Sequence, residues 1–156
     1  MFRRMLLSIL LLGFAVPAHA KSDDDLPFWS AIKVKELNMR VGPGEDYRIV
    51  WVYHRPMLPM KVLRRMEGWW LVQDPDGAKG WVLAQFLNRK RAMMVTGQGL
   101  AEMRAKPDPG AKLLWKLEPG VTGSLGDCDA GWCQVDLGEG RNGYVRQDRL
   151  WGAADL

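Results

Sequence analysis

Two cysteines and one histidine are the side chains best suited to nucleophilic or metal chemistry. Cys128 and Cys133 are the only cysteines, and His54 is the only histidine beyond residue 20. A Cys–His nucleophile needs a free thiol beside an imidazole that a third group orients, and a metal site needs further ligands. Because His54 lies in the other half of the chain, we expect neither a Cys–His catalytic pair nor a metal site.

Two pairs of aspartates are the candidates for acid and base chemistry. A glycosidase sets two carboxyl groups across a cleft, and the available pairs are Asp74/Asp76 and Asp127/Asp129. Both lie in turn sequences, where Asp is favoured because its side chain bonds nearby backbone amides. Residues 42–44 (Gly-Pro-Gly) are no phosphate loop, because no Gly-Lys-Ser/Thr follows. We therefore expect a protein that is not an enzyme and needs no cofactor.

The chain is rich in tryptophan, which indicates binding rather than catalysis. All eight tryptophans lie beyond residue 20, at positions 29, 51, 69, 70, 81, 115, 132 and 151. Trp69 and Trp70 are neighbours in an expected strand, so their rings point to opposite faces. An outward ring beside a groove offers apolar area and an indole N–H donor to a peptide or glycan. The alternative is that such rings pack between modules.

The elements that must position these side chains occur twice. Three segments recur with nearly constant spacing, at offsets of 64, 63 and 63 for Met39 to Met103, Trp69 to Trp132 and Trp81 to Tyr144. The matching stretches are 37–44 with 100–107, 68–72 with 131–135, and 80–82 with 143–145. We predict two domains, at 33–89 and 92–152, behind a leader at 21–32. Domains this small bury only about 60% of their unfolded surface, so packing of one copy on the other would add apolar burial.

Each copy reads as short strands between turn signals. Residues 49–53 are rich in β-branched and aromatic residues, and Asp76-Gly77 is a hairpin-turn dipeptide. Residues 84–87 favour a single helical turn of the 3₁₀ type. The fold class predicted is all-β, with two tandem small β-barrels that each carry a short 3₁₀ turn.

The first twenty residues have the pattern of a cleaved signal peptide. Arg3-Arg4 precede an apolar run at 5–16 and a small-residue cleavage site at 18–20. The run is too short to serve as a lasting membrane anchor, so we expect export to a periplasm or the extracellular space with no anchor after cleavage. Removing Arg3 and Arg4 leaves 20 of the 22 basic residues against 18 acidic ones. Without a basic stripe, we expect no nucleic-acid partner.

Export makes a disulfide between Cys128 and Cys133 the favoured state of the cysteines. The residues between them include Asp129, Ala130 and Gly131, which suit a tight turn between two strands. A bridge closing so short a loop contributes about 2 kcal/mol in the chain-entropy estimate. A reactive thiol or a metal site is the alternative.

The motifs together resemble the bacterial SH3 domain family. They are Asn-Met-Arg-Val-Gly-Pro-Gly at 38–44, Gly-Trp-Trp-Leu-Val at 68–72 and Gly-Trp-Val at 80–82, and the resemblance spans about 33–151. The second copy departs from the pattern, since Met103-Arg104-Ala105 lacks the Val-Gly-Pro-Gly run and Tyr144 replaces a tryptophan. The resemblance implies a five- to six-stranded barrel and a non-catalytic role in binding peptides or cell-wall peptidoglycan.

By this resemblance the groove candidates are Trp69 and, through the repeat, Trp132, with Tyr47, Tyr53 and Arg40 as flanking residues. Packing between the copies is the alternative for the tryptophans, strand packing for Tyr53, and loop fastening for Arg40. The implied partner is a peptidoglycan stem peptide or a peptide segment of a protein. The alternative function is a scaffold whose two barrels pack as one rigid unit. If only one copy binds, the first is favoured because it keeps the loop and the paired tryptophans.

Overall fold

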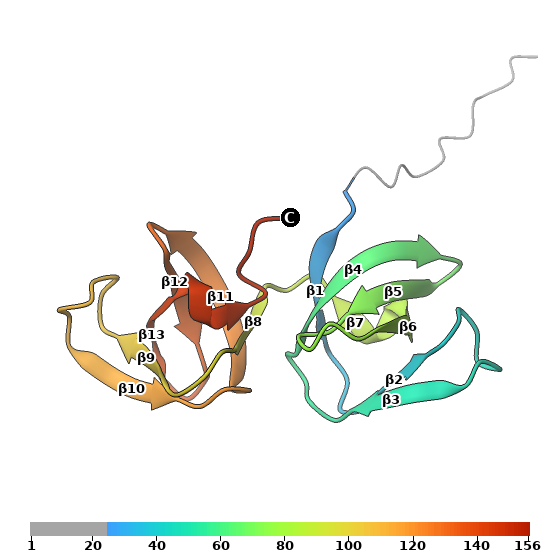
Figure 1. Cartoon of the computed structure of the whole chain (residues 1–156), viewed down its shortest axis with the longest axis horizontal. Coiled ribbons are helices and arrows are strands. Elements are labelled where there is room, and N and C mark those ends of the chain that lie inside the picture. Colours follow the sequence, from blue (N-terminus) through green and yellow to red (C-terminus); the bar gives the residue numbers. More distant parts are fainter. Residues whose placement is uncertain (1–24) are drawn as a thin grey trace, which may run out of the picture.

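The protein folds as two all-β barrels that lie side by side, each with its own sheet and 3₁₀ turn (Figure 1). This computed structural model describes residues 25–156. The fold class expected from the sequence is confirmed. The predicted signal peptide at 1–20 lies outside the described residues. Along residues 25–156, no helix is long and apolar enough to cross a membrane.

The first barrel is a curled antiparallel sheet of seven strands. In sheet order these are β3 (Ile49–Tyr53), β2 (Leu37–Arg40), β6 (Lys79–Leu83), β5 (Trp69–Gln73), β4 (Pro59–Met66), β1 (Phe28–Ile32) and β7 (Leu87–Asn88). The 3₁₀ helix η1 (Ala84–Phe86) connects β6 to β7. Strand β3 therefore stands at one edge of the sheet, with the long loop 41–48 between it and β2.

The second barrel repeats this order strand for strand, as a duplicated sequence requires. Its sheet runs β10 (Leu113–Leu117), β9 (Ala101–Arg104), β13 (Asn142–Arg146), β12 (Trp132–Asp136), β11 (Thr122–Asp129), β8 (Ala92–Val95) and β14 (Leu150–Trp151). Helix η2 (Gln147–Arg149) corresponds to η1. Strand β10 is the edge strand that corresponds to β3.

Strand β1 occupies part of the expected leader. The sequence places the start of the first domain at residue 33, but β1 pairs with both β4 and β7 and so belongs to the first sheet. Ala31 and Ile32 are fully buried, and the Ser30 hydroxyl donates to the carbonyl oxygen of Asn88 at 2.6 Å. These side chains fill the gap between β4 and β7 as β8 does in the second barrel. Subtracting the 64-residue offset from β8 (Ala92–Val95) gives residues 28–31, so the repeat itself locates β1.

Alternating side chains form a separate core in each barrel, as strand periodicity requires. The fully buried members of the first core are Ile32, Leu37, Met60, Val62, Val72 and Val82. Those of the second are Met93, Val95, Met103, Cys133, Val135 and Val145.

One hairpin carries the disulfide between Cys128 and Cys133, which is confirmed. The two cysteines face each other on β11 and β12, and the turn between them holds Ala130 and Gly131 at φ values of 47° and 81°. Positive φ at both central residues is the mark of a type I′ hairpin turn. The first barrel has the same turn at Glu67 and Gly68, with φ of 42° and 85°.

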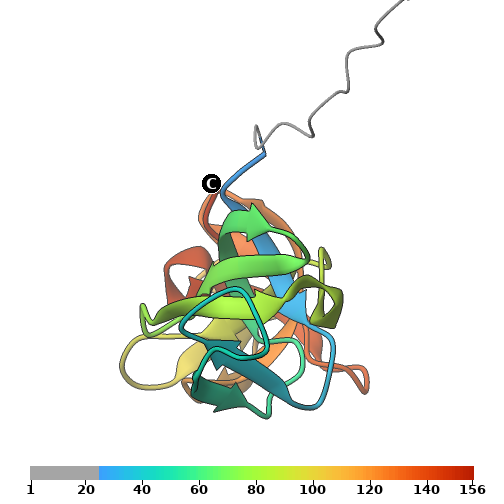
Figure 2. The same ribbon diagram turned by 90° about the vertical axis from the view of Figure 1, so that its right-hand side faces the viewer.

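The barrels contact each other along a seam formed by β1, β4, β8 and the C-terminal segment. In the view of Figure 2 the first barrel lies in front of the second. Met94 of β8 packs against the first core. The indole nitrogen of Trp29 donates to the carbonyl oxygen of Ala154 at 2.7 Å. Arg55 donates from its guanidinium to the carbonyl oxygen of Gly120. The copies are therefore fastened by polar as well as apolar contacts.

Candidate functional site

Trp69 begins β5 and is mostly buried, although it lies outside the core cluster of the first barrel. Its side chain is only 8% exposed, and it borders a small hollow of about 60 Å³ that also touches Arg40 and Phe86. Its neighbour Trp70 points the other way and meets Phe28 edge to face, with ring centroids 5.3 Å apart. The two rings thus take opposite faces, and each packs against protein.

The long loop 41–48 is fastened by Arg40. Its guanidinium donates to the carbonyl oxygens of Glu45 at 2.8 Å and Tyr47 at 2.7 Å. The Tyr47 ring covers Gly42 so closely that a Cβ added there would come within 2.4 Å of the ring. Arg40 therefore lines the Trp69 hollow and also holds the loop by these hydrogen bonds. Tyr47 is half exposed and does not line that hollow.

Trp132 borders a larger hollow in the second barrel, of about 270 Å³. The indole is 6% exposed. Arg146 lies near its ring, with the guanidinium carbon 5.5 Å from the ring centroid. Arg149 lines the same hollow and donates to the carbonyl oxygens of residues 96, 98 and 99. At the 63-residue offset, Leu83 and Phe86 stand in place of these arginines. The charged residues of the first hollow are Glu36, Glu45 and Arg40, so the first hollow is acidic on balance and the second is cationic.

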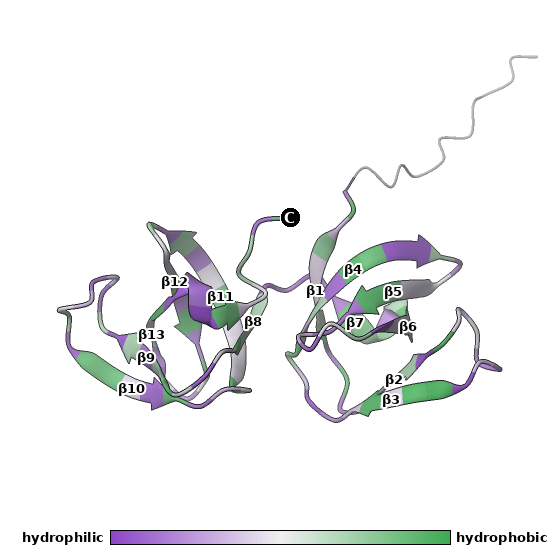
Figure 3. Cartoon of the chain, viewed as in Figure 1, coloured by the Kyte–Doolittle hydropathy of each residue, from purple (hydrophilic) through white to green (hydrophobic). Residues whose placement is uncertain are grey.

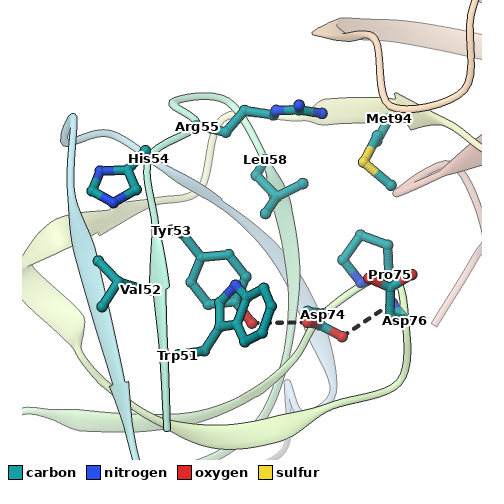
Figure 4. Close-up of a pocket in the computed structure, with 10 residues that line it drawn as sticks. All are labelled: Trp51, Val52, Tyr53, His54, Arg55, Leu58, Asp74, Pro75, Asp76 and Met94. Carbon is teal, nitrogen blue, oxygen red and sulfur yellow. Dashed lines mark hydrogen bonds between the residues drawn. The ribbon is translucent and has the colours of Figure 1, made fainter. Parts of the chain in front are cut away.

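Tyr53 does not line the Trp69 hollow, because it belongs to the core of the first barrel and borders a different hollow. It is buried and donates from its hydroxyl to Asp74 Oδ2 at 2.8 Å (Figure 4). Burial, together with the hydrogen bond and charge of Asp74, raises the pKa of Tyr53 well above its ordinary value. Asp74 Oδ1 accepts the amide N–H groups of Asp76 and Ala78 at 3.0 and 2.8 Å. The turn role predicted for this aspartate is confirmed.

A third hollow, of about 380 Å³, lies beside the Tyr53–Asp74 pair. It reaches from Trp51 on β3 to Met94 on β8. Trp51 is 59% exposed and its counterpart Trp115 is 50% exposed; Figure 3 shows apolar residues along both edge strands, β3 and β10. Sequence reasoning assigned Trp51 to an ordinary strand. The signal that could have singled it out was its recurrence on an edge strand of both copies.

Metal-binding clusters are absent from residues 25–156, where no group of three or more His, Cys, Asp or Glu side chains is placed to hold an ion. Three of the hollows on these residues are each bordered by a tryptophan and by charged side chains. The arrangement can hold a small polar ligand by stacking, ion pairing and hydrogen bonding.

Two small antiparallel barrels, each with a 3₁₀ turn before its last strand, define the class of SH3-like domains. The chain belongs to the bacterial SH3 domain family: the family's sequence model matches it twice, over residues 33–87 and 98–152. The family predicted from the motifs is thereby confirmed.

One relative is the Bacillus subtilis (strain 168) protein named "Putative N-acetylmuramoyl-L-alanine amidase YrvJ", which is 26% identical over 117 residues. The match covers 68% of this chain and 22% of that protein, so the chain spans about a fifth of the relative's length.

Three solved structures overlap this one in part. NlpC2 and NlpC1 from Trichomonas vaginalis are 12% and 13% identical, with TM-scores of 0.36 and 0.37. The matches cover 80% and 84% of this chain and 48% of each of theirs. An NlpC/P60 family protein from Bacillus cereus ATCC 10987 is 13% identical, with a TM-score of 0.36 over 79% of this chain and 55% of that one.

Proposed function

We propose that the protein is a non-catalytic binding module of the cell envelope that recognises peptidoglycan or short peptides. The observation that carries this proposal is the hollow beside Trp132, where an aromatic ring lies next to two arginines and Glu102. A peptidoglycan stem peptide carries carboxylates, and guanidinium groups bind carboxylates through paired N–H donors. The name of the amidase relative supports the same ligand.

Export to a periplasm, or to the extracellular space, belongs to the proposal. It relies on the signal-peptide pattern at 1–20 and on the cysteine pair. A disulfide such as Cys128–Cys133 persists in oxidising compartments and is rare in reducing ones. The peptide ligand and the compartment are therefore consistent with each other.

Retention on purified sacculi tests the proposal. The wild type, Arg146→Gln and Lys116→Gln are incubated with sacculi, and the bound fraction is measured after washing. Arg146 lines the Trp132 hollow, whereas Lys116 is exposed on β10, so the two variants lose the same charge at different places. We expect retention of the wild type and of Lys116→Gln, and weaker retention of Arg146→Gln. Absence of wild-type retention would contradict peptidoglycan as the ligand.

The predicted groove residues are compared in the same assay through Trp69→Ala and Trp132→Ala. Both rings are buried, so each variant is first shown to be folded by its thermal unfolding. We propose that the Trp132 hollow binds more strongly than the Trp69 hollow because it is larger and cationic. Retention of Trp69→Ala and Trp132→Ala equal to that of the wild type would remove both hollows from the site.

A scaffold made of two fixed barrels is the second candidate function. The observation in its favour is the seam, where Trp29, Trp151 and Arg55 each donate a hydrogen bond to the opposite barrel. Such a body would hold its two outer surfaces at a fixed distance. A scaffold without a wall ligand would show no retention on sacculi while the seam stayed intact.

A further inference from the structure

The hollow beside Trp51 continues into a second one, so that together they form one long groove on the first barrel. The two hollows have volumes of about 380 and 300 Å³ and share Trp51, Asp74 and Asp76. One end reaches Arg55 and Met94 at the seam, and the other reaches Lys79. An elongated groove of this kind suits an extended chain rather than a compact ligand.

Two aspartates in the groove differ in their contacts: hydrogen bonds hold Asp74 in place, and the carboxylate of Asp76 is free to bind a ligand. Asp74 is fully engaged by the Tyr53 hydroxyl and two backbone amides. It thereby fixes the turn that carries Asp76. The Asp76 carboxylate is exposed and, among residues 25–156, takes part in no ion pair or side-chain hydrogen bond. The groove thus presents an unpaired negative charge at a defined place.

Trp51 supplies the aromatic ring of a cation-binding site whose carboxylate is that of Asp76. Its indole stands next to the Tyr53 ring, with centroids 6.3 Å apart, and borders both hollows (Figure 4). An ammonium group is attracted to the face of an indole and forms strong hydrogen bonds with a carboxylate. A groove that offers an exposed indole and an unpaired carboxylate together is therefore complementary to an alkylammonium group.

Arg55 provides the opposite charge at the seam end of the groove. One of its N–H groups donates to the carbonyl oxygen of Gly120 in the second barrel. Within the described part of the chain it forms no ion pair with an acidic side chain. Because a guanidinium has five N–H donors, Arg55 can hold the seam and still bind a carboxylate of a ligand.

The second copy serves as an internal comparison. At the corresponding offsets, Tyr53 and Asp74 are replaced by Leu117 and Leu137. The counterpart of Asp76 is Glu139, which is paired with Arg141 at 3.2 Å. A tryptophan on the edge strand is thus common to both barrels. In the second barrel Asp136 accepts the Gly138 amide N–H in the corresponding turn, but the acid beside it, Glu139, is paired.

We propose that this groove is a binding site for an extended peptide, distinct from the Trp69 and Trp132 hollows. The ammonium group of the peptide lies against Trp51 and Asp76, and a carboxylate lies against Arg55. The inference rests on the proposed function only in taking the ligand to be a peptide. Since Met94 of the second barrel forms one wall, the complete site needs both copies.

The test is titration of the full chain with N-acetyl-Ala-Glu-Lys-Ala, and with the same peptide acetylated on its lysine. Calorimetry measures the Kd, and the indole N–H signals in NMR spectra show which tryptophan the peptide contacts. The variants are Asp76→Asn and Trp51→Leu. Their matched controls in the second barrel are Glu139→Gln and Trp115→Leu. All four positions are exposed, and thermal unfolding checks that each variant is folded.

We expect a shift of the Trp51 signal, and a Kd that rises about tenfold on either first-barrel substitution or on lysine acetylation, the scale of one cation–π or charged contact. The control variants should bind like the wild type. No peptide binding, equal binding of the acetylated peptide, or equal effects of the controls would overturn the inference. Sacculi retention without peptide binding would overturn this site alone. Peptide binding at Trp51 without sacculi retention would support the site and contradict peptidoglycan as the ligand in the proposed function.

Discussion

Trp151 of the second barrel donates a hydrogen bond from its indole nitrogen to the carbonyl oxygen of Pro59 in the first barrel, at 3.0 Å. Trp29 donates in the opposite direction, from the first barrel to Ala154. The two indoles also meet edge to face, with centroids 4.9 Å apart. Each barrel thus places one tryptophan against the opposite barrel. Two small barrels gain stability from their duplication because each supplies contacts that the other lacks alone.

Replacing Trp151 by Phe tests the seam. The ring area is largely retained, but the carbonyl of Pro59 loses its donor, so we expect a loss of about 1 kcal/mol in the free energy of unfolding. Urea unfolding measures it. Trp115→Phe is the matched control because Trp115 is half exposed on the edge strand and makes no side-chain hydrogen bond in the described structure. Equal effects of the two substitutions would contradict a role for the hydrogen bond.

Reduction of the disulfide should destabilise the second barrel by about 2 kcal/mol. Cys133 is fully buried, so Cys128→Ala/Cys133→Ala is preferable to serine, which would bury a hydroxyl. Urea unfolding of the wild type with and without reductant, and of the double alanine variant, measures the effect. The variant should be insensitive to reductant. A reductant effect on the variant as large as that on the wild type would show that the bridge is not the cause.

The bridge also shows what repetition in a sequence can predict. Cys128 and Cys133 occupy the cross-strand position that Arg65 and Trp70 occupy in the first barrel. Export and the turn residues between the cysteines predicted a clamped hairpin, and the 63-residue offset identifies its counterpart in the first barrel. The two sheets share one strand order, because copies of one module with similar sequences adopt the same fold.

The positions of the candidate site residues were harder to predict than the fold. Tyr53 and Trp69 were placed at one groove, yet Tyr53 bonds Asp74 on another side of the barrel. The exposure of Trp51 depends on β3 being an edge strand. Such facts are set by strand order across the sheet, and a local pattern of alternating residues does not encode it.

Tyr53→Phe should destabilise the first barrel by about 1 to 3 kcal/mol, because the buried Asp74 Oδ2 loses its donor. The same pair sets a pH dependence. The folded-state pKa of Tyr53 is raised above its ordinary 10.0. The contribution of the neutral Tyr53 hydroxyl to the free energy of unfolding is therefore fully present below pH 10 and is lost as the pH rises through the folded-state pKa.

Absorbance at 295 nm during an alkaline titration follows this change. The chain has three tyrosines, and we expect the ionisation of Tyr53 to be delayed beyond the ordinary tyrosine pKa of 10.0. In Tyr53→Phe the delayed step should be missing. If the delayed ionisation persists in Tyr53→Phe, it belongs to another tyrosine and the prediction is wrong.

Asp25 should titrate below its ordinary pKa. Its carboxylate accepts hydrogen bonds from Arg89 and, at 2.9 Å, from Arg65. The hydrogen bond from Arg89 is the largest cause of the lowered pKa, and Arg65 adds to it. Both guanidinium groups also lie over the Phe28 ring at the start of β1, at 3.7 and 4.8 Å from its centroid. Asp25 therefore helps to fasten the entry of the chain into the first barrel.

Because the folded-state pKa is lowered, the ion pairs are fully formed above pH 3.8 and are lost as the pH falls through the folded pKa below that value. NMR titration of the Asp25 carboxyl carbon measures the midpoint. Arg89→Gln should move the midpoint up toward 3.8, whereas Arg91→Gln, which removes a charge two residues away, should leave it in place. A wild-type midpoint at or above 3.8 would show that Asp25 is not held by these arginines in solution.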